Sequence, residues 1–277
     1  MMRLACGSRR LDLRAPVVMG VLNVTPDSFS DGGRFLDPAL ALAHARDMLA
    51  AGASILDVGG ESTRPGAAII DTAEELRRVL PVVRALVGEL DAVISVDTSN
   101  PEVMAQVLDA GAHLINDVRA LQRPGALEAL AGSQAAVCLM HMQGEPQTMQ
   151  QQPSYGQVVE EVHAFLQQRM QTCQALGIAR ERLCIDPGFS FGKRLEDNLA
   201  LLRRLREFTD LGVPVLAGLS RKSLLGVLTG RPADQRLAGS LALACIAALN
   251  GARIIRAHDV AATVDVLRVV AAVSGEN

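Results

Sequence analysis

Eight polar side chains each follow a short run of apolar residues, and they are of types that bind polar ligands. Carboxylates and amides can pair with the N–H groups of a ligand, and arginine can balance an anion. Each Asn or Asp also has an ordinary explanation as a turn residue or helix cap, because both are poor strand formers. One shared site explains all eight together better than eight separate caps do. We therefore predict an active site formed by Asn23, Asp57, Asp97, Asn116, His141, Asp186, Ser220 and Arg256.

The apolar runs that precede these residues alternate with longer segments of helical periodicity. The predicted strands cover residues 17–24, 54–58, 92–96, 113–115, 136–140, 182–185, 213–217 and 253–255. The predicted helices cover residues 38–51, 71–87, 101–110, 125–131, 155–176, 198–208, 234–249 and 260–273. Continuously apolar strands are typical of parallel sheets that are buried on both faces. The pattern predicts one α/β domain over residues 1–277, a (β/α)8 or TIM barrel, in which the C-terminal ends of the strands form the catalytic face.

Two of the predicted βα loops, residues 23–37 and 59–71, are much longer than such loops usually are. The first contains glycines and Phe29, and the second contains Thr63 and Arg64. Their length indicates mobile lids or ligand clamps at the catalytic face, with ordinary turn chemistry as the alternative for either loop alone.

The composition is that of a folded globular protein without a nucleic-acid or membrane partner. Of 277 residues, 49% are hydrophobic and 21% are charged, and the net charge of −3 comes from interspersed acids and bases. The five cysteines lack a C-x-x-C pair and lie mostly in apolar runs, which indicates buried free thiols in a reducing compartment. The first residues show no apolar signal segment, and the longest uncharged stretch, 237–252, is too short to span a bilayer. We expect a cytoplasmic protein.

The segment 19–33, with the sequence MGVLNVTPDSFSDGG, resembles the first signature of the dihydropteroate synthases, which are pterin-binding barrels. Residues 59–66 resemble the second signature, and further matches follow at 95–98, 115–117, 140–144, 186–193, 220–222 and 256–259. The resemblance covers nearly the whole chain, and its matches fall at the predicted strand ends. Two positions depart from the family pattern, Ser190 where Gly is usual and Ala257 where Val is usual, and these leave only local loop and packing detail open.

This resemblance implies a transferase of folate biosynthesis that condenses 6-hydroxymethyl-7,8-dihydropterin diphosphate with p-aminobenzoate, giving 7,8-dihydropteroate and diphosphate. A pterin presents an exocyclic amine beside a ring N–H, and one buried carboxylate, here Asp186, can accept from both. Asn116 suits the adjacent ring edge, Met140 can pack on the ring face, and Asp97 lies close to the ring by analogy. If diphosphate leaves before the amine attacks, Asp97 and Asp186 favour the cationic pterin, and no general base is required.

The diphosphate leaving group needs cations at the barrel rim, because negative charge develops on it as the bond breaks. The resemblance assigns this role to Arg64, Arg256 and His258, with a Mg²⁺ ion near Asn23 that takes most of its ligands from diphosphate and water. The predicted catalytic residues are Asp97, Asp186, Lys222, Arg256 and His258.

The carboxylate of the acceptor needs a positive or N–H-rich site, and the segment Ser220-Arg-Lys222 is expected to open a helix or short turn that supplies one. Ser220 suits that carboxylate, and by resemblance Lys222 contacts the pterin and borders the acceptor pocket. Phe191 and Phe29 are expected to sandwich the benzoate ring, with core packing as the alternative for Phe191. Two residues of the second long loop join them, Thr63 and Pro65.

Three other functions remain open at this point. A pterin-binding methyltransferase with a corrinoid partner shares the carboxylate and amide ring but needs neither the two long loops nor Arg256 with His258. A barrel aldolase would use Lys222 as a Schiff-base nucleophile, although this lysine lies in a loop rather than in a strand. A catalytically inactive pterin-binding protein has no need of the full polar ring. Turnover of a pterin diphosphate distinguishes all three.

The last two predicted helices carry little charge. Residues 237–249 contain no charged side chain, although an outer barrel helix should show one polar stripe to water. Residues 260–273 are nearly charge-free. We therefore predict a homodimer that forms through these two helices.

Overall fold

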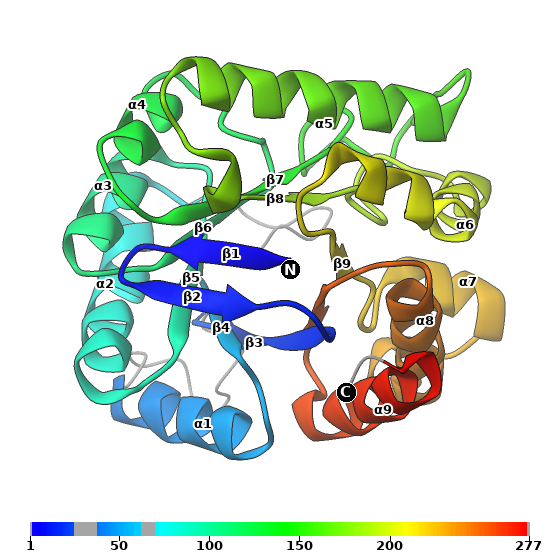
Figure 1. Ribbon diagram of the computed structural model, residues 1–277, viewed down its shortest axis with the longest axis horizontal. Helices are drawn as coiled ribbons and strands as arrows, with labels where there is room; N and C mark the ends of the chain where they lie inside the picture. The colour runs from blue at the N-terminus through cyan, green and yellow to red at the C-terminus, as the bar shows by residue number, and fades with distance from the viewer. Residues whose placement is uncertain (1, 25–37, 62–69, 276–277) are drawn as a thin grey trace.

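Short segments rich in β-branched residues and leucine form a parallel barrel, as the sequence predicts. The computed structural model describes residues 2–24, 38–61 and 70–275. In this part of the chain eight parallel strands are hydrogen-bonded in the order β8-β7-β6-β5-β4-β3-β10-β9. An isolated bridge between Ile185 and Val215 joins the two ends of this sheet, and the barrel closes (Figure 1). The strands are β3 Val17–Asn23, β4 Ile55–Gly59, β5 Val93–Asp97, β6 Leu114–Asp117, β7 Ala136–Met140, β8 Leu183–Asp186, β9 Leu216–Gly218 and β10 Ile254–Ala257.

Helices surround the strands (Figure 1). Two of them begin at capping side chains, because Asp71 and Asn100 accept hydrogen bonds from Glu74 N and Glu102 N. The helices are α1 Pro38–Ala50, α2 Thr72–Glu89, α3 Pro101–Asp109, α4 Ala126–Ala131, α5 Val158–Ala175, α6 Leu195–Arg203, α7 Ser223–Thr229, α8 Leu237–Leu249 and α9 Val260–Ser274. The predicted (β/α)8 barrel is confirmed.

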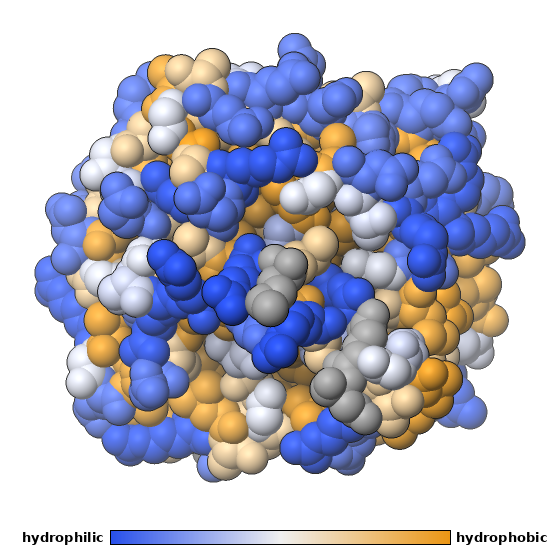
Figure 2. All heavy atoms as spheres, viewed as in Figure 1, coloured by the Kyte–Doolittle hydropathy of each residue, from blue (hydrophilic) through white to orange (hydrophobic). Residues whose placement is uncertain are grey.

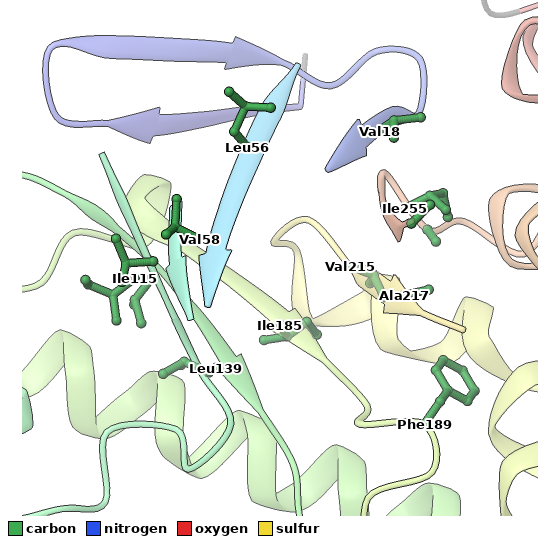
Figure 3. Close-up of a cluster of buried hydrophobic side chains, with 14 of the residues drawn as sticks. Val18, Leu56, Val58, Ile115, Leu139, Ile185, Phe189, Val215, Ala217 and Ile255 are labelled. Atoms are coloured by element: carbon green, nitrogen blue, oxygen red, sulfur yellow. The ribbon is translucent and has the colours of Figure 1, made fainter. Parts of the chain in front are cut away.

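Alternation along the strands divides the core into two layers. Residues such as Val18, Leu56 and Ile185 point outward and pack under the helices, where Phe189 joins them (Figure 3). Their neighbours in the chain point into the barrel and form a separate apolar cluster, which includes Met19, Ile55, Val93, Leu114, Ala136, Cys184, Leu216 and Ile254. These inward residues stand near the N-terminal ends of their strands, so the C-terminal half of the barrel interior is left for other side chains.

A β-hairpin that the sequence analysis did not predict covers the N-terminal end of the barrel. Strands β1 (Arg3–Cys6) and β2 (Arg9–Asp12) pair antiparallel around Gly7, whose φ is +62°. The hairpin lies in front of the barrel in Figure 1. Its alternate apolar residues join the inner cluster, namely Leu4, Cys6, Leu11 and Leu13. That alternation around a Gly-Ser turn is a hairpin signal that was present in the sequence.

Several other elements differ from their predicted bounds, and two of the differences lie near the site. The predicted helix 198–208 divides into α6 and a 3-10 segment, Leu205–Leu211. Strand β9 is shorter than the predicted 213–217, since Pro214 has no N–H to donate to a neighbouring strand. The segment after β9 opens α7, one of the two possibilities predicted for it.

The five cysteines are free thiols, as the sequence predicts, and four of them are buried. Among the residues that the structure describes, no helix is both long and apolar enough to cross a membrane.

Candidate active site

The inward positions at the C-terminal ends of the strands carry polar side chains instead of apolar ones. Parallel register places these residues beside one another on adjacent strands, because Asp97 is aligned with Asn116, and Met140 with Asp186. Asn23 is aligned with Gly59, which is in turn aligned with Asp97. Asn23, Asp97, Asn116 and Asp186 of the predicted ring therefore gather at one end of the barrel, opposite the hairpin.

Arg256 on β10 is bound by two carboxylates of this ring. Its Nε donates to Asp57 Oδ2 at 2.6 Å, and its Nη2 donates to Asp97 Oδ2 at 2.9 Å. Asp57, which is fully buried, also accepts from Ser95 Oγ at 2.6 Å and from Asn116 Nδ2 at 3.0 Å. The sequence analysis placed Asp57 in the ring but assigned it no role. Its role is to bind side chains from other strands, and those partners cannot be read from the sequence.

Burial raises the pKa of Asp97 to about 7, and the neighbouring charge of Arg256 opposes the rise. Burial also raises the pKa of Asp186, against the opposing effect of Lys222. The barrel mouth thus contains three carboxylates, those of Asp57, Asp97 and Asp186, close to the two cations Arg256 and Lys222.

Asp186, Lys222 and Arg256 converge around Gly218 on β9. A Cβ atom at Gly218 would lie 3.9 Å from Asp186 Oδ2, 3.7 Å from Lys222 Nζ and 3.8 Å from Arg256 Cβ. The lack of a side chain at Gly218 keeps the space between these three residues open. Sequence analysis missed this glycine, since its only signal is its place at a strand end.

Lys222 connects this cluster to the segment after β8. Its Nζ donates to Phe189 O at 2.6 Å and lies 4.6 Å from the centroid of the Phe191 ring. Burial lowers the pKa of Lys222 to about 8, and Asp186 opposes that shift. Phe191 is half-buried beside Lys222, and its predicted contact with the acceptor ring stays a prediction.

Ser220 and His258 lie together at the rim of the barrel. Ser220 Oγ accepts from the backbone N–H of His258 at 3.2 Å and is 3.1 Å from His258 Nδ1. An ion pair between the next residues, Arg221 and Asp259, joins the same two segments. The segments after β9 and β10 are therefore cross-linked at the rim.

His141 faces away from this cluster although it belongs to the predicted ring. Its Nδ1 is 2.9 Å from Lys193 Nζ, and its ring packs edge-on against Phe165. Burial lowers its pKa to about 3, with a further lowering from Lys193, so the imidazole is neutral. Lys193 is buried and was not predicted to take part in the site.

Four predicted site residues cannot be placed. Phe29 belongs to the segment 25–37, and Thr63, Arg64 and Pro65 belong to the segment 62–69, both of which lie outside the described residues. The prediction that these two loops act as mobile lids therefore stays a prediction.

A closed parallel barrel with buried carboxylates, an amide and two cations at its C-terminal mouth defines a barrel enzyme that binds a polar ring and an anion. The family described as "Pterin binding enzyme" matches residues 19–258. The dihydropteroate synthase of Escherichia coli K12 is 54% identical over 271 residues, which are 98% of this chain and 96% of that protein.

Solved structures agree with this similarity. A Yersinia pestis dihydropteroate synthase in complex with a sulfonamide drug superimposes with a TM-score of 0.94 at 51% identity, covering 99% of this chain and 100% of that one. A Xanthomonas albilineans dihydropteroate synthase with 4-aminobenzoic acid gives 0.93 at 52% identity, covering 98% of both chains. A complex of the Xanthomonas enzyme with 7,8-dihydropteroate gives 0.90 at 50% identity, again with 98% of both chains covered. The chain belongs to the pterin-binding enzymes and, within them, to the dihydropteroate synthases.

Proposed function

We propose that this transferase joins 6-hydroxymethyl-7,8-dihydropterin diphosphate to p-aminobenzoate through the side chains that converge on Gly218. The observation that carries the proposal is the convergence of the Asp186 carboxylate, the Lys222 amino group and the base of the Arg256 side chain beside Gly218, at the barrel mouth of a dihydropteroate synthase. The carboxylate fits the pterin N–H groups, and the two cations fit an anionic leaving group and an anionic acceptor.

Asp186 and Asn116 form the pterin-binding edge. Gly188 N donates to Asp186 Oδ1 at 2.7 Å, which fixes the carboxylate and leaves Oδ2 directed toward the open space beside Gly218. Asn116 donates its amide N–H to Asp57, so its carbonyl oxygen is the acceptor that a ring N–H meets. Met140 is buried next to Asp186 and offers a polarisable side chain to the ring face.

In the reaction the bond between the pterin methylene carbon and the diphosphate oxygen breaks, and diphosphate leaves with the electron pair. The lone pair of the aromatic amine forms the new carbon–nitrogen bond, and the amine then loses one proton. Asp97 and Asp186 stabilise positive charge on the pterin if the leaving group departs first. Arg256, which Asp57 and Asp97 hold in place, and His258 at the rim stabilise the negative charge of diphosphate, together with Arg64.

The acceptor is bound between the rim and the segment after β8. Ser220 and Lys222 interact with its carboxylate, and Phe191 packs against its ring beside Lys222. Phe29, Thr63 and Pro65 complete the pocket in this proposal. A sulfonamide that mimics the acceptor competes for the same pocket.

A Mg²⁺ ion fits this site with few protein ligands. The side-chain oxygen of Asn23 lies at the barrel mouth, 3.5 Å from where a Cβ atom of Gly59 would be. The described residues include no group of three or more His, Cys, Asp or Glu side chains that could hold a metal. The diphosphate and water must therefore supply the other ligands, as Mg²⁺ commonly accepts. The ion would supply charge neutralisation to the leaving group.

The exposed stripe of α8 supports the proposed homodimer. Ile246 and Leu249 lie on one side of α8 and are each more than 40% exposed, and Val269 and Val273 are exposed on the neighbouring helix α9. Figure 2 shows hydrophobic surface at the lower right, where Figure 1 places α7 and α8. A second copy of this chain would cover that surface, since exposed apolar patches often mark interfaces between proteins. The free thiols support a place in the cytoplasm.

Release of pyrophosphate tests the proposed reaction. The enzyme is incubated with the pterin diphosphate, with and without p-aminobenzoate and Mg²⁺. We expect release and formation of 7,8-dihydropteroate when both are present, and a large loss of rate when either is omitted. Absence of release under every condition would overturn the proposal.

A further inference from the structure

Lys193 is a buried ammonium that binds backbone carbonyls of two segments at the barrel mouth. It is only 3% exposed, and its Nζ donates to Gly188 O at 2.9 Å, Phe191 O at 3.0 Å and His141 O at 3.3 Å. The fourth contact is His141 Nδ1 at 2.9 Å. None of these four acceptors is a carboxylate, so the ammonium binds the turn that follows β8 to the end of β7 rather than completing an ion pair.

The backbones of these two segments are also packed directly against each other. A Cβ atom at Gly188 would lie 1.8 Å from His141 O, and one at Gly192 would lie 2.3 Å from Gln143 O. Both glycines have positive φ, so a side chain is excluded there by conformation and by space. Tyr155 adds a hydrogen bond from its hydroxyl to Gly192 O at 2.7 Å. The turn 188–192 therefore has one position relative to β7, and Lys193 lies at the centre of the contact.

This turn carries the contacts that bring Lys222 into the site. Phe189 O accepts from Lys222 Nζ, and the Phe191 ring lies under the same ammonium. The turn also begins at Gly188, whose N–H fixes the carboxylate of Asp186. The two lysines of the chain thus bind neighbouring carbonyls of one turn, Lys193 at Gly188 and Phe191, and Lys222 at Phe189.

An apolar residue of similar length would fill the same volume but leave His141 O and Phe191 O without a donor, and Gly188 O with only the N–H of Phe191. An unpaired buried carbonyl is costly, and the turn would move to recover hydrogen bonds with water or with other donors. Such movement changes the position of Phe191 more than that of Asp186, because Asp186 belongs to β8 itself and the Phe191 ring stands at the far end of the turn.

We propose that Lys193 is a positioning residue that sets the acceptor pocket by fixing Phe191 and, through Phe189 O, Lys222. The proposal rests on the proposed function, since it takes this pocket to be that of p-aminobenzoate. Lys193 itself does not touch either substrate.

The test compares Lys193→Met with a matched variant, Arg182→Met. Arg182 is also a buried cation that donates to two backbone carbonyls, Ala135 O at 2.8 Å and Leu130 O at 3.1 Å, but it lies at the N-terminal end of β8. We expect Lys193→Met to raise KM for p-aminobenzoate by about tenfold or more, and KM for the pterin diphosphate by less than about threefold. Arg182→Met should lower the melting temperature and leave both KM values unchanged.

A double-mutant cycle separates positioning from general destabilisation. If Lys193 acts through the phenylalanine ring, Lys193→Met should raise the acceptor KM much less in a Phe191→Ala background than in the wild type. Should Lys193→Met fail to fold, Gly192→Ala displaces the same turn from its other side and should reproduce the selective rise in acceptor KM.

The outcomes are distinct from a failure of the proposed function. Wild-type and Arg182→Met enzymes that release no pyrophosphate would overturn the reaction itself. Normal turnover in these two, together with unchanged or equally raised KM values for both substrates in Lys193→Met and Gly192→Ala, would overturn the role of Lys193 alone.

Discussion

Asp57 and Arg256 form an ion pair across strand β3, which separates their two strands in the barrel. The pair is almost closed to water, because the carboxylate of Asp57 is fully buried. Asp57 also orients Asn116, so one side chain that contacts no substrate fixes two that are proposed to do so. Removing its charge should affect leaving-group and pterin contacts together.

Asp57→Asn should therefore lower kcat/KM for the pterin diphosphate by about 100-fold, since a broken buried pair leaves Arg256 without its main partner. Steady-state kinetics measure this loss. Ser95→Ala is the control, because it removes another donor to Asp57 and leaves Arg256 and Asn116 bound. A Ser95→Ala enzyme as impaired as Asp57→Asn would contradict the assignment.

Asp186→Ala should greatly lower kcat/KM for the pterin diphosphate, because two N–H groups of the pterin lose their acceptor in a closed pocket. Sites that rely on such pairing lose roughly 10⁴-fold when it is removed. Kinetics with the pterin diphosphate check this, and thermal unfolding shows whether the fold persists. A fall in kcat/KM of less than about tenfold, or about 1.4 kcal/mol, would mean that Asp186 does not bind the pterin.

Activity should fall on the alkaline side of pH 8. Lys222 has a pKa of about 8, lowered by burial, so its ammonium is charged below that pH and neutral above it. Because the charged form is proposed to bind the acceptor carboxylate, kcat/KM for p-aminobenzoate should decrease as pH rises through about 8. Reductive methylation with ¹³C-labelled reagent gives an independent titration, since the chain contains just two lysines. A pH-independent kcat/KM between 7 and 9.5 would exclude this role.

Ser190→Gly should stabilise the enzyme by about 1 kcal/mol, because a non-glycine residue with positive φ is strained and a buried hydroxyl without a partner is costly. Ser190 has a φ of +66°, and its Oγ is buried without a hydrogen-bond partner. Denaturant unfolding measures the change. Arg221→Gly is the contrasting variant, because Arg221 also has positive φ, +58°, but its side chain pairs with Asp259. We expect Arg221→Gly not to raise the free energy of unfolding. Equal increases in Ser190→Gly and Arg221→Gly would assign the effect to the positive φ alone.

Ile246→Glu should convert the proposed dimer to monomer, because it places a charge in the exposed apolar stripe of α8. Sedimentation velocity at micromolar concentration reports the mass. Leu176→Glu, a similar change at an exposed leucine after α5, should leave the mass unchanged. A wild-type enzyme that sediments as a monomer would show that this surface has another partner or none.

The barrel and the strand-end residues could be predicted because both follow from local patterns. Continuous apolar runs indicate buried parallel strands. A polar residue at the C-terminal end of such a run lies at the catalytic face of a barrel. The pairings could not be predicted in the same way. Arg256 meets Asp57 across 199 positions of sequence, and Lys193 meets His141 across 52, so only the closed barrel brings them together.

The strained backbone conformation of Ser190 also could not be predicted from the sequence, because it depends on contacts with a distant segment. Ser190 differs from the family's usual glycine by two heavy atoms, and the sequence shows only that the substitution is small. Its cost comes from a positive φ that the turn 188–192 imposes through contacts with the segment after β7. The β1–β2 hairpin is a different case, since its alternating pattern was visible but short.

The hairpin also imposes an order on folding during synthesis. Its strands precede every barrel strand in the chain, yet Leu4, Cys6, Leu11 and Leu13 share one apolar cluster with Leu216 and Ile254, which the ribosome adds more than 200 residues later. The cluster that covers the apolar face of the hairpin therefore stays incomplete until β9 and β10 have been synthesised. A segment made before all eight barrel strands is thus among the last to complete its native contacts, and the nascent chain carries a partly exposed apolar hairpin until then.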